Sequence, residues 1–192
     1  MILGEEFVDQ EGNKYRTICV EDQIWMIDNY KGTKYRNGEN IQKAIDDETY
    51  LKLGSTGKGA WCLNYNDKER SSEYGYLYNW FSVHDARGFA PKGWRIPSEE
   101  DWNTLEKHLE AKTQNGTSWN KLIKLMNMSY SGSRGINGAF GGADKSAYWW
   151  KFMPEMAIMS WGRRLQSTGK QLEPIDGFQR FGFSVRLIKS CL

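Results

Sequence analysis

Alternating polar and apolar residues near the start of the chain predict a β-hairpin. Residues 14–20, KYRTICV, follow a turn at residues 11–13, EGN, and residues 23–27, QIWMI, continue the alternation. Aromatic and β-branched side chains suit a pleated strand, while Gly and Asn tolerate the positive φ of a turn. We therefore expect two strands joined at Glu21 and Asp22.

The clearest helical pattern covers residues 97–109. Ser98 is placed as an N-cap and Asp101 three residues later completes a capping box. Trp102, Leu105 and Leu109 then share one face at i, i+3 and i+7. Weaker patterns predict helices over 76–83 and 119–126, and one helical turn over 46–53 within long loops that extend from 28 to 60.

The C-terminal part alternates again over residues 163–167 and 182–188. Strands at both ends with helices between them predict a single α+β domain over residues 1–192. We expect the strand at 15–20 to pair with the strand at 185–187, which would bring the termini together.

Composition indicates a core built from aromatic rings. The chain has nine Trp, ten Tyr and eight Phe, although only 39% of its residues are hydrophobic. This aromatic content excludes a disordered chain, and no apolar run is long enough to span a membrane. We assign five aromatic residues to the core rather than to a sugar-binding platform: Tyr35, Trp61, Trp80, Trp94 and Trp102.

Charge is nearly balanced overall but uneven along the chain. The formal net charge is +2, which argues against nucleic acid as a partner. Residues 1–48 carry a net charge of −5 and residues 145–192 a net charge of +5. We expect these two ends to complement each other within the fold.

Eight short motifs occur in order along the chain: DQEGNKYRT at 9–17, QIWM at 23–26, TKYRNG at 33–38, GAWC at 59–62, YGYLYNW at 74–80, APKGWRIPS at 90–98, YWW at 148–150 and GFSVR at 182–186. Together they resemble the Fibrobacter succinogenes major paralogous domain, over residues 7–189. The resemblance implies a C-type lectin-like fold with paired N- and C-terminal strands, two main helices and long loops. It also implies a secreted or cell-surface protein, although the first residues lack the features of a signal peptide.

Catalytic and metal-binding patterns are weak. Cys19, Cys62 and Cys191 show no metal-ligand spacing and no cysteine pair of the kind used by the related formylglycine-generating fold. His84, followed by Asp85, is the arrangement most similar to a catalytic base with an acidic partner. Calcium binding of the lectin type would need an oxygen ligand where Ile175 follows Glu173 and Pro174, with Asp176 as a substitute. We therefore expect no catalytic centre, no metal and no cofactor.

The favoured function is ligand binding by a surface near the C-terminus. Three Met residues, a Phe and a Trp lie between residues 152 and 161, and adaptable apolar residues are common at binding surfaces. The predicted contact residues are Phe152, Met156, Met159, Trp161, Arg163 and Gln166. The ligand would be a protein or a glycan on a cell surface. If this segment is core instead, the site moves to the loops around Asn37, Asn66 and Arg134.

A special case of this function is suggested by the strand-loop-strand before the GFSVR motif. It is similar to variable proteins of phages or bacteria that are diversified by retroelements. In such proteins a lectin-like scaffold tolerates replacement of many surface residues.

Overall fold

The computed structural model describes residues 2–153 and 162–191. Its helices are α1 (Asp47–Ser55), α2 (Lys68–Tyr74), α3 (Trp80–Val83), α4 (Glu99–Gln114) and α5 (Trp119–Leu125), with a 3-10 turn η1 (Asn64–Asn66) before α2. Its strands are β1 (Ile2–Leu3), β2 (Phe7–Val8), β3 (Lys14–Tyr15), β4 (Thr17–Val20), β5 (Gln23–Met26), β6 (Gln42–Lys43), β7 (Ala60–Cys62), β8 (Leu77–Tyr78), β9 (Ser133–Arg134), β10 (Phe140–Gly141), β11 (Ser146–Trp150), β12 (Gly162–Gln166), β13 (Leu172–Ile175) and β14 (Ile188–Ser190).

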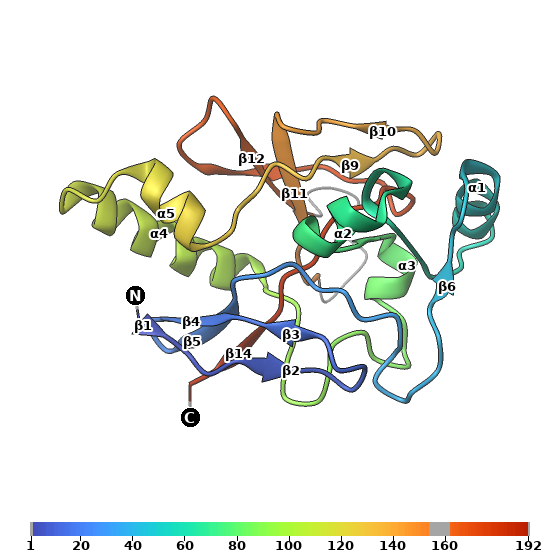
Figure 1. The fold of residues 1–192 in the computed structure, drawn as a ribbon, viewed down its shortest axis with the longest axis horizontal. Helices are drawn as coiled ribbons and strands as arrows, with labels where there is room; N and C mark the ends of the chain where they lie inside the picture. The colour runs from blue at the N-terminus through green and yellow to red at the C-terminus, as the bar shows by residue number, and fades with distance from the viewer. Residues whose placement is uncertain (1, 154–161, 192) are drawn as a thin grey trace.

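Within the described residues, the strands form several small sheets. One has the order β1-β4-β5-β14, two have three strands in the orders β11-β12-β13 and β6-β7-β8, and two are ribbons, β2-β3 and β9-β10. Figure 1 shows the four-stranded sheet below α4 and α5, with β11 and β12 above, and both termini at the same end of the molecule. The α+β class is confirmed. The C-type lectin-like arrangement stays a prediction.

The N-terminal hairpin forms as expected, but its pairing with the C-terminal strand differs. Strands β4 and β5 pair antiparallel on either side of Glu21 and Asp22, and Glu21 takes a φ of 53°. The C-terminal strand β14 pairs with β5 rather than with β4, and the Met26 N–H donates to the Leu187 carbonyl at 2.9 Å. Because β1 occupies the outer edge of β4, β5 offers the free edge of this sheet.

The capping box of α4 is confirmed. The Ser98 hydroxyl accepts from the Asp101 N–H, and the Asp101 carboxylate accepts from the Ser98 N–H. The helix continues five residues beyond its predicted end at residue 109. Helices α1 and α5 match the other two expected segments, at 46–53 and 119–126.

The helix expected over 76–83 is only half correct. Leu77 and Tyr78 form β8, which pairs with Trp61 and Cys62 of β7, and only the turn that follows is helical. Strand pairing therefore overrides the local helical periodicity. The sequence reading also missed α2, whose N-terminus is capped by Asp67 through the Arg70 N–H at 3.0 Å.

Aromatic side chains fill the interior as the composition indicated. Tyr35, Trp61, Trp80, Trp94 and Trp102 are all buried, and the first four belong to one core cluster with the rings of other segments. Trp102 packs edge-on against Trp25 in a second cluster, between α4 and the N-terminal sheet. This ring-filled core is the support on which the loops rest.

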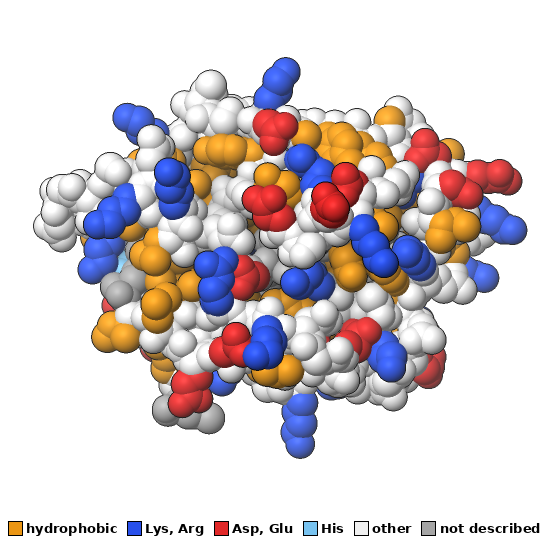
Figure 2. Space-filling model, in the orientation of Figure 1, with side chains coloured by type: hydrophobic (Ala, Val, Ile, Leu, Met, Phe, Trp, Pro, Cys, Tyr) orange, Lys and Arg blue, Asp and Glu red, His pale blue; other side chains and the backbone are white. Residues whose placement is uncertain are grey.

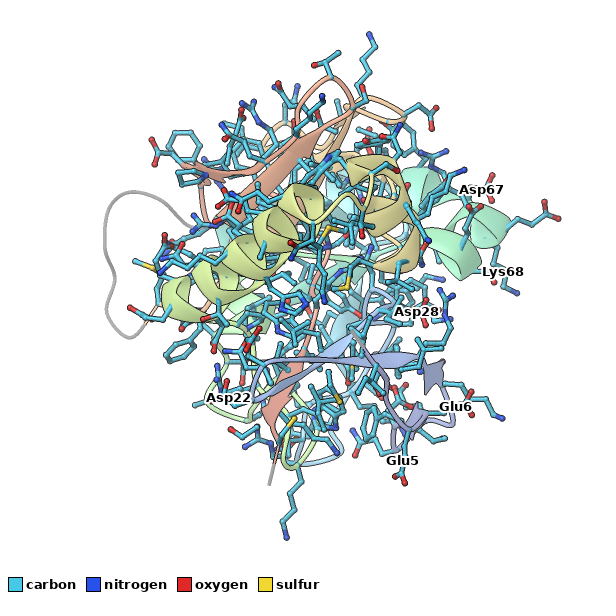
Figure 3. The ribbon with its side chains drawn as sticks, turned by 90° about the vertical axis from the view of Figure 1, so that its left-hand side faces the viewer. Glu5, Glu6, Asp22, Asp28, Asp67 and Lys68 are labelled. Atoms are coloured by element: carbon cyan, nitrogen blue, oxygen red, sulfur yellow. The ribbon has the colours of Figure 1, made fainter. Side chains whose placement is uncertain are left out.

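Charged side chains of both signs are interspersed over the face in Figure 2. Near the N-terminus, Glu5 and Glu6 point outward and Asp22 lies at the tip of the β4–β5 hairpin (Figure 3). Arg163 pairs with Glu99 and Glu106 of α4, and Arg164 pairs with Glu173 of β13. These pairs therefore do not provide the expected complementarity between the two ends of the chain. No helix among the described residues is both long and apolar enough to cross a membrane.

Candidate functional site

Of the six predicted contact residues, Phe152 is the one that the structure places at an open hollow. Its side chain is 44% exposed, and its N–H donates to the Pro97 carbonyl at 2.7 Å. Gln166 lies half-buried at the end of β12. Met156, Met159 and Trp161 lie outside the described residues, so their role stays a prediction.

Arg163 is buried, which differs from the expected exposed contact residue. Its side chain is 2% exposed, and its Nη2 donates to Glu99 Oε1 at 2.6 Å and to Asn103 Oδ1 at 2.8 Å. The expected alternation of β12 is present, but Arg163 and Leu165 are on the buried face. The sequence held a signal for this: Glu99, Asn103 and Glu106 form a polar stripe on α4 at i, i+4 and i+7.

Phe152 closes one side of a hollow of about 220 Å³, which we call the Phe152 pocket. Buried Val83, Phe89 and Ile96 line its apolar part. The residues that complete its lining are Arg36, His84, Asp85, Gly88, Ala90 and Arg95. The pocket thus combines an apolar floor with two arginines from different loops.

His84 is held in the wall of this pocket by ring stacking. Its ring centroid lies 3.5 Å from that of Trp80 and 5.7 Å from that of Phe152, with only 8° between the His84 and Phe152 planes. Burial lowers the pKa of His84 to about 4, and its Nε2 has no hydrogen-bond partner among the described residues. At neutral pH His84 therefore contributes an uncharged aromatic surface.

The two arginines of the pocket are fixed differently. Arg95 forms a two-pronged ion pair with Asp101, with Nη2 at 2.9 Å from Oδ1. Arg36 uses its Nε to donate to the Ala90 carbonyl at 2.8 Å, and no ion pair joins it to another described residue. Arg36 is therefore the cation left to meet a negative group from outside.

A second, more polar hollow of about 320 Å³ shares the Asp85 wall, and we call it the Tyr35 pocket. Arg87 lines it and donates two hydrogen bonds to the Asp85 carboxylate, each at 2.7 Å. These hydrogen bonds hold the pKa of Asp85 below its ordinary value. Tyr35 contributes the inner wall, and the lining is completed by Asn40, Gln42, Gly57, Lys58 and Gly59.

His84 and Asp85, the candidate acid–base pair, do not contact each other as such a pair would. Asp85 bonds to Arg87, while the Nε2 of His84 is left without a partner among the described residues. The two side chains are adjacent in sequence but engage different neighbours. His84 stacks between Trp80 and Phe152, whereas Asp85 forms an ion pair with Arg87.

The family model described as the Fibrobacter succinogenes major domain matches residues 18–189. The chain belongs to the Fibrobacter succinogenes major domain family. No curated protein and no solved structure is significantly similar to it.

Both pockets of this Fibrobacter succinogenes major domain lie inside the matched region. The TKYRNG motif supplies Tyr35 and Arg36, and the APKGWRIPS motif supplies Ala90, Arg95 and Ile96. The loop around Asn37, the alternative position for the site, therefore contributes Tyr35 to one pocket and Arg36 to the other, although Asn37 itself lines neither. The sequence did not predict Arg36, Arg87 or Arg95 as site residues. Arg36 and Arg95 nevertheless belong to two of the eight family motifs.

The three cysteines of this domain are free thiols in different surroundings. Cys62 is buried, whereas the thiols of Cys19 and Cys191 lie near each other. The hairpin explains this proximity, because the Cys191 N–H donates to the Asp22 carbonyl at 2.8 Å. Neither thiol lines the two pockets described above.

The described residues contain no group of three or more His, Cys, Asp or Glu side chains placed to hold a metal ion. Glu173, considered as a calcium ligand, is paired with Arg164 at 2.6 Å.

Proposed function

We propose that this domain is a non-catalytic ligand-binding module that recognises a protein through the Phe152 pocket. The observation that supports the proposal most is the exposed Phe152 ring beside an apolar hollow flanked by Arg36. Aromatic and Arg residues are enriched among the residues that dominate protein interfaces. A half-exposed Phe in a concave site is therefore a suitable anchor.

The volume of the Phe152 pocket indicates the size of the side chain that a partner protein would insert into it. A volume of about 220 Å³ equals roughly seven water molecules, and a Phe side chain has about seven non-hydrogen atoms. Arg36 at the rim then favours a carboxylate next to the inserted group. The expected ligand is a peptide segment with a large apolar residue beside Asp or Glu.

Selection from a displayed library of random peptides tests this proposal. Peptides with an apolar residue next to an acidic one should be enriched on the full chain. Phe152→Ala should weaken their binding by about tenfold or more, because it removes the aromatic ring that contacts the inserted apolar residue. Phe178→Ala is the matched control, since Phe178 is 67% exposed outside the pocket, and its binding should be unchanged. Equal losses in both variants, or no enriched motif, would contradict the proposal.

Carbohydrate binding is the alternative function for the same domain. A glycan array probed with and without calcium separates the two. Binding to a defined glycan that is insensitive to Phe152→Ala would favour the alternative.

We further propose that variation in this family is confined to exposed positions if a retroelement diversifies it. The variable stretch of such a protein would correspond to about residues 131–185 of this chain, which contain fully buried Arg134, Trp149 and Trp150. A template repeat of the gene would have to spare their codons. Differences from the template at these three codons would contradict this proposal.

A further inference from the structure

Two of the three cysteines meet beside the turn between β4 and β5. Cys19 is half-buried on β4, and Cys191 is exposed directly after β14. The Cys191 thiol is in hydrogen-bond contact with the Cys19 thiol. Cys62 is buried on β7, which belongs to a different sheet, so it is separated from this pair.

The strand register explains why these two thiols meet. Cys19 of β4 and Lys189 of β14 both lie opposite Ile24, on the two sides of β5. Because alternate residues of a strand point to the same face, Cys191 continues on the face shared by Cys19 and Lys189. The Cys191 N–H also donates to the Asp22 carbonyl at 2.8 Å, which holds the end of the chain at the turn. The proximity of the thiols therefore follows from the backbone pairing of the sheet.

The surroundings of the cysteines determine which of them can be oxidised. Cys191 is exposed, so a small oxidant can reach its sulfur atom from solvent. Desolvation and the adjacent Cys19 raise the pKa of Cys191, so its reactive thiolate becomes more abundant as the pH rises. Burial raises the pKa of Cys62 to about 11, and this thiol is also closed to solvent. Oxidation should therefore join Cys19 to Cys191 and leave Cys62 as a thiol.

We propose that Cys19 and Cys191 form a reversible disulfide that fastens the end of β14 to the N-terminal hairpin. With glutathione disulfide as the oxidant, the thiolate of one cysteine attacks a glutathione sulfur, forms a mixed disulfide and releases one glutathione thiolate. The thiolate of the other cysteine then attacks the mixed disulfide at the protein sulfur and releases the second glutathione thiolate. The protein thiols lose two protons and two electrons, and one glutathione disulfide takes them up to become two glutathione thiols.

This bond would stabilise the edge of the four-stranded sheet. Strand β14 is the outermost strand of that sheet and pairs with β5 over Ile188–Ser190. The loop closed by the bond would contain nearly the whole chain, and a disulfide that closes a long loop restricts the unfolded chain strongly. Oxidising surroundings should therefore stabilise the domain relative to reducing ones. This role goes beyond ligand binding, because neither thiol lines the Phe152 pocket.

Equilibration of the full chain with reduced or oxidised glutathione, followed by denaturation and alkylation, tests the proposal. The reduced protein should take up three alkyl groups, one for each cysteine, and the oxidised monomer only one, at Cys62. Peptide mapping should recover the Cys19 and Cys191 peptides joined to each other, and excess reduced glutathione should restore all three thiols. Three reactive thiols after oxidation, a lasting mixed disulfide with glutathione, or a dimer linked through Cys191 would overturn the proposal.

Variants of the exposed and the buried cysteine locate the bond. After oxidation Cys191→Ser should keep two reactive thiols, whereas Cys62→Ala should keep none. Oxidation should raise the urea midpoint of the wild type by about 1 M or more and leave that of Cys191→Ser unchanged. Equal midpoints for the oxidised and reduced wild type, or the same rise in Cys191→Ser, would contradict the stabilising role. Peptide binding at the Phe152 pocket is measured separately, so either proposal can fail alone.

Discussion

At the scale of single residues, buried polar side chains explain why several motif positions need their particular chemistry. Arg186 of the GFSVR motif is buried, and its guanidinium donates to the carbonyls of Met126 and Asn127 at 2.6 and 2.8 Å. These carbonyls follow the C-terminus of α5, where a cation is favourable. Arg186 thus joins the last strands to α5.

Replacing Arg186 tests this role. Arg186→Met keeps much of the volume but leaves two carbonyls without donors, so we expect a loss of about 2–4 kcal/mol in the free energy of unfolding. Urea denaturation measures it. Lys170→Met on the exposed turn after β12 should change stability by less than about 0.5 kcal/mol, and a similar loss in both variants would contradict the assigned role.

His84 gives a pH-dependent prediction. Burial lowers its folded-state pKa from 6.5 to about 4, so between these values the unfolded chain binds a proton that the folded chain does not. Its contribution to stability is complete above about pH 6.5 and is lost as the pH falls toward 4. His84→Phe keeps a ring between Trp80 and Phe152 but cannot titrate. Its urea midpoint should therefore decline less than that of the wild type from pH 7 to 4, and parallel declines would refute the assignment.

At the scale of elements, α4 organises the C-terminal sheet through charge as well as packing. Glu99 accepts from Lys151 Nζ at 2.5 Å and from Arg163 Nη2 at 2.6 Å, and both cations are almost fully buried. Although burial opposes it, these hydrogen bonds hold the pKa of Glu99 below its ordinary value. Glu99 therefore pairs with two buried cations at once, and Glu106 lies 3.8 Å from Arg163 as a further carboxylate.

Glu99→Gln should destabilise the domain by about 2 kcal/mol at pH 7, because it leaves Lys151 and Arg163 with weaker partners. The lowered pKa means that the ionised Glu99 stabilises the fold above pH 4.5 and that this contribution is lost as the pH falls below it. The difference between wild type and variant should thus shrink in acid. Glu110→Gln, on the exposed side of α4, is the control for urea denaturation at each pH, and a difference independent of pH would contradict this account.

Elements determined by interactions between residues close in sequence were predictable. Elements that depend on contacts between residues far apart in sequence were not. Ser98 and Asp101 define the start of α4 from four adjacent residues, and the β4–β5 hairpin needs only its own turn. Leu77 and Tyr78 instead become a strand because β7 lies beside them. Arg163 was taken for a contact residue because its partners on α4 are about sixty positions away in sequence.

At the scale of the whole molecule, a core of aromatic rings supports loops that carry both pockets. Loop residues of the TKYRNG and APKGWRIPS motifs meet residues 83–90 at these hollows. Binding residues are commonly held on loops by such a rigid support. The sequence indicated Phe152 and the loop around Asn37 separately, but their proximity to His84 depends on the tertiary fold.

We propose that a protein ligand binds at the Phe152 pocket. Amide chemical shifts of the labelled chain, recorded with a selected peptide, test it most directly. We predict that the largest shifts cluster at residues 83–90, 95–96 and 152, with little change in β9 and β10, which line neither pocket. Shifts concentrated in β9 and β10, with residues 83–90 unaffected, would contradict it.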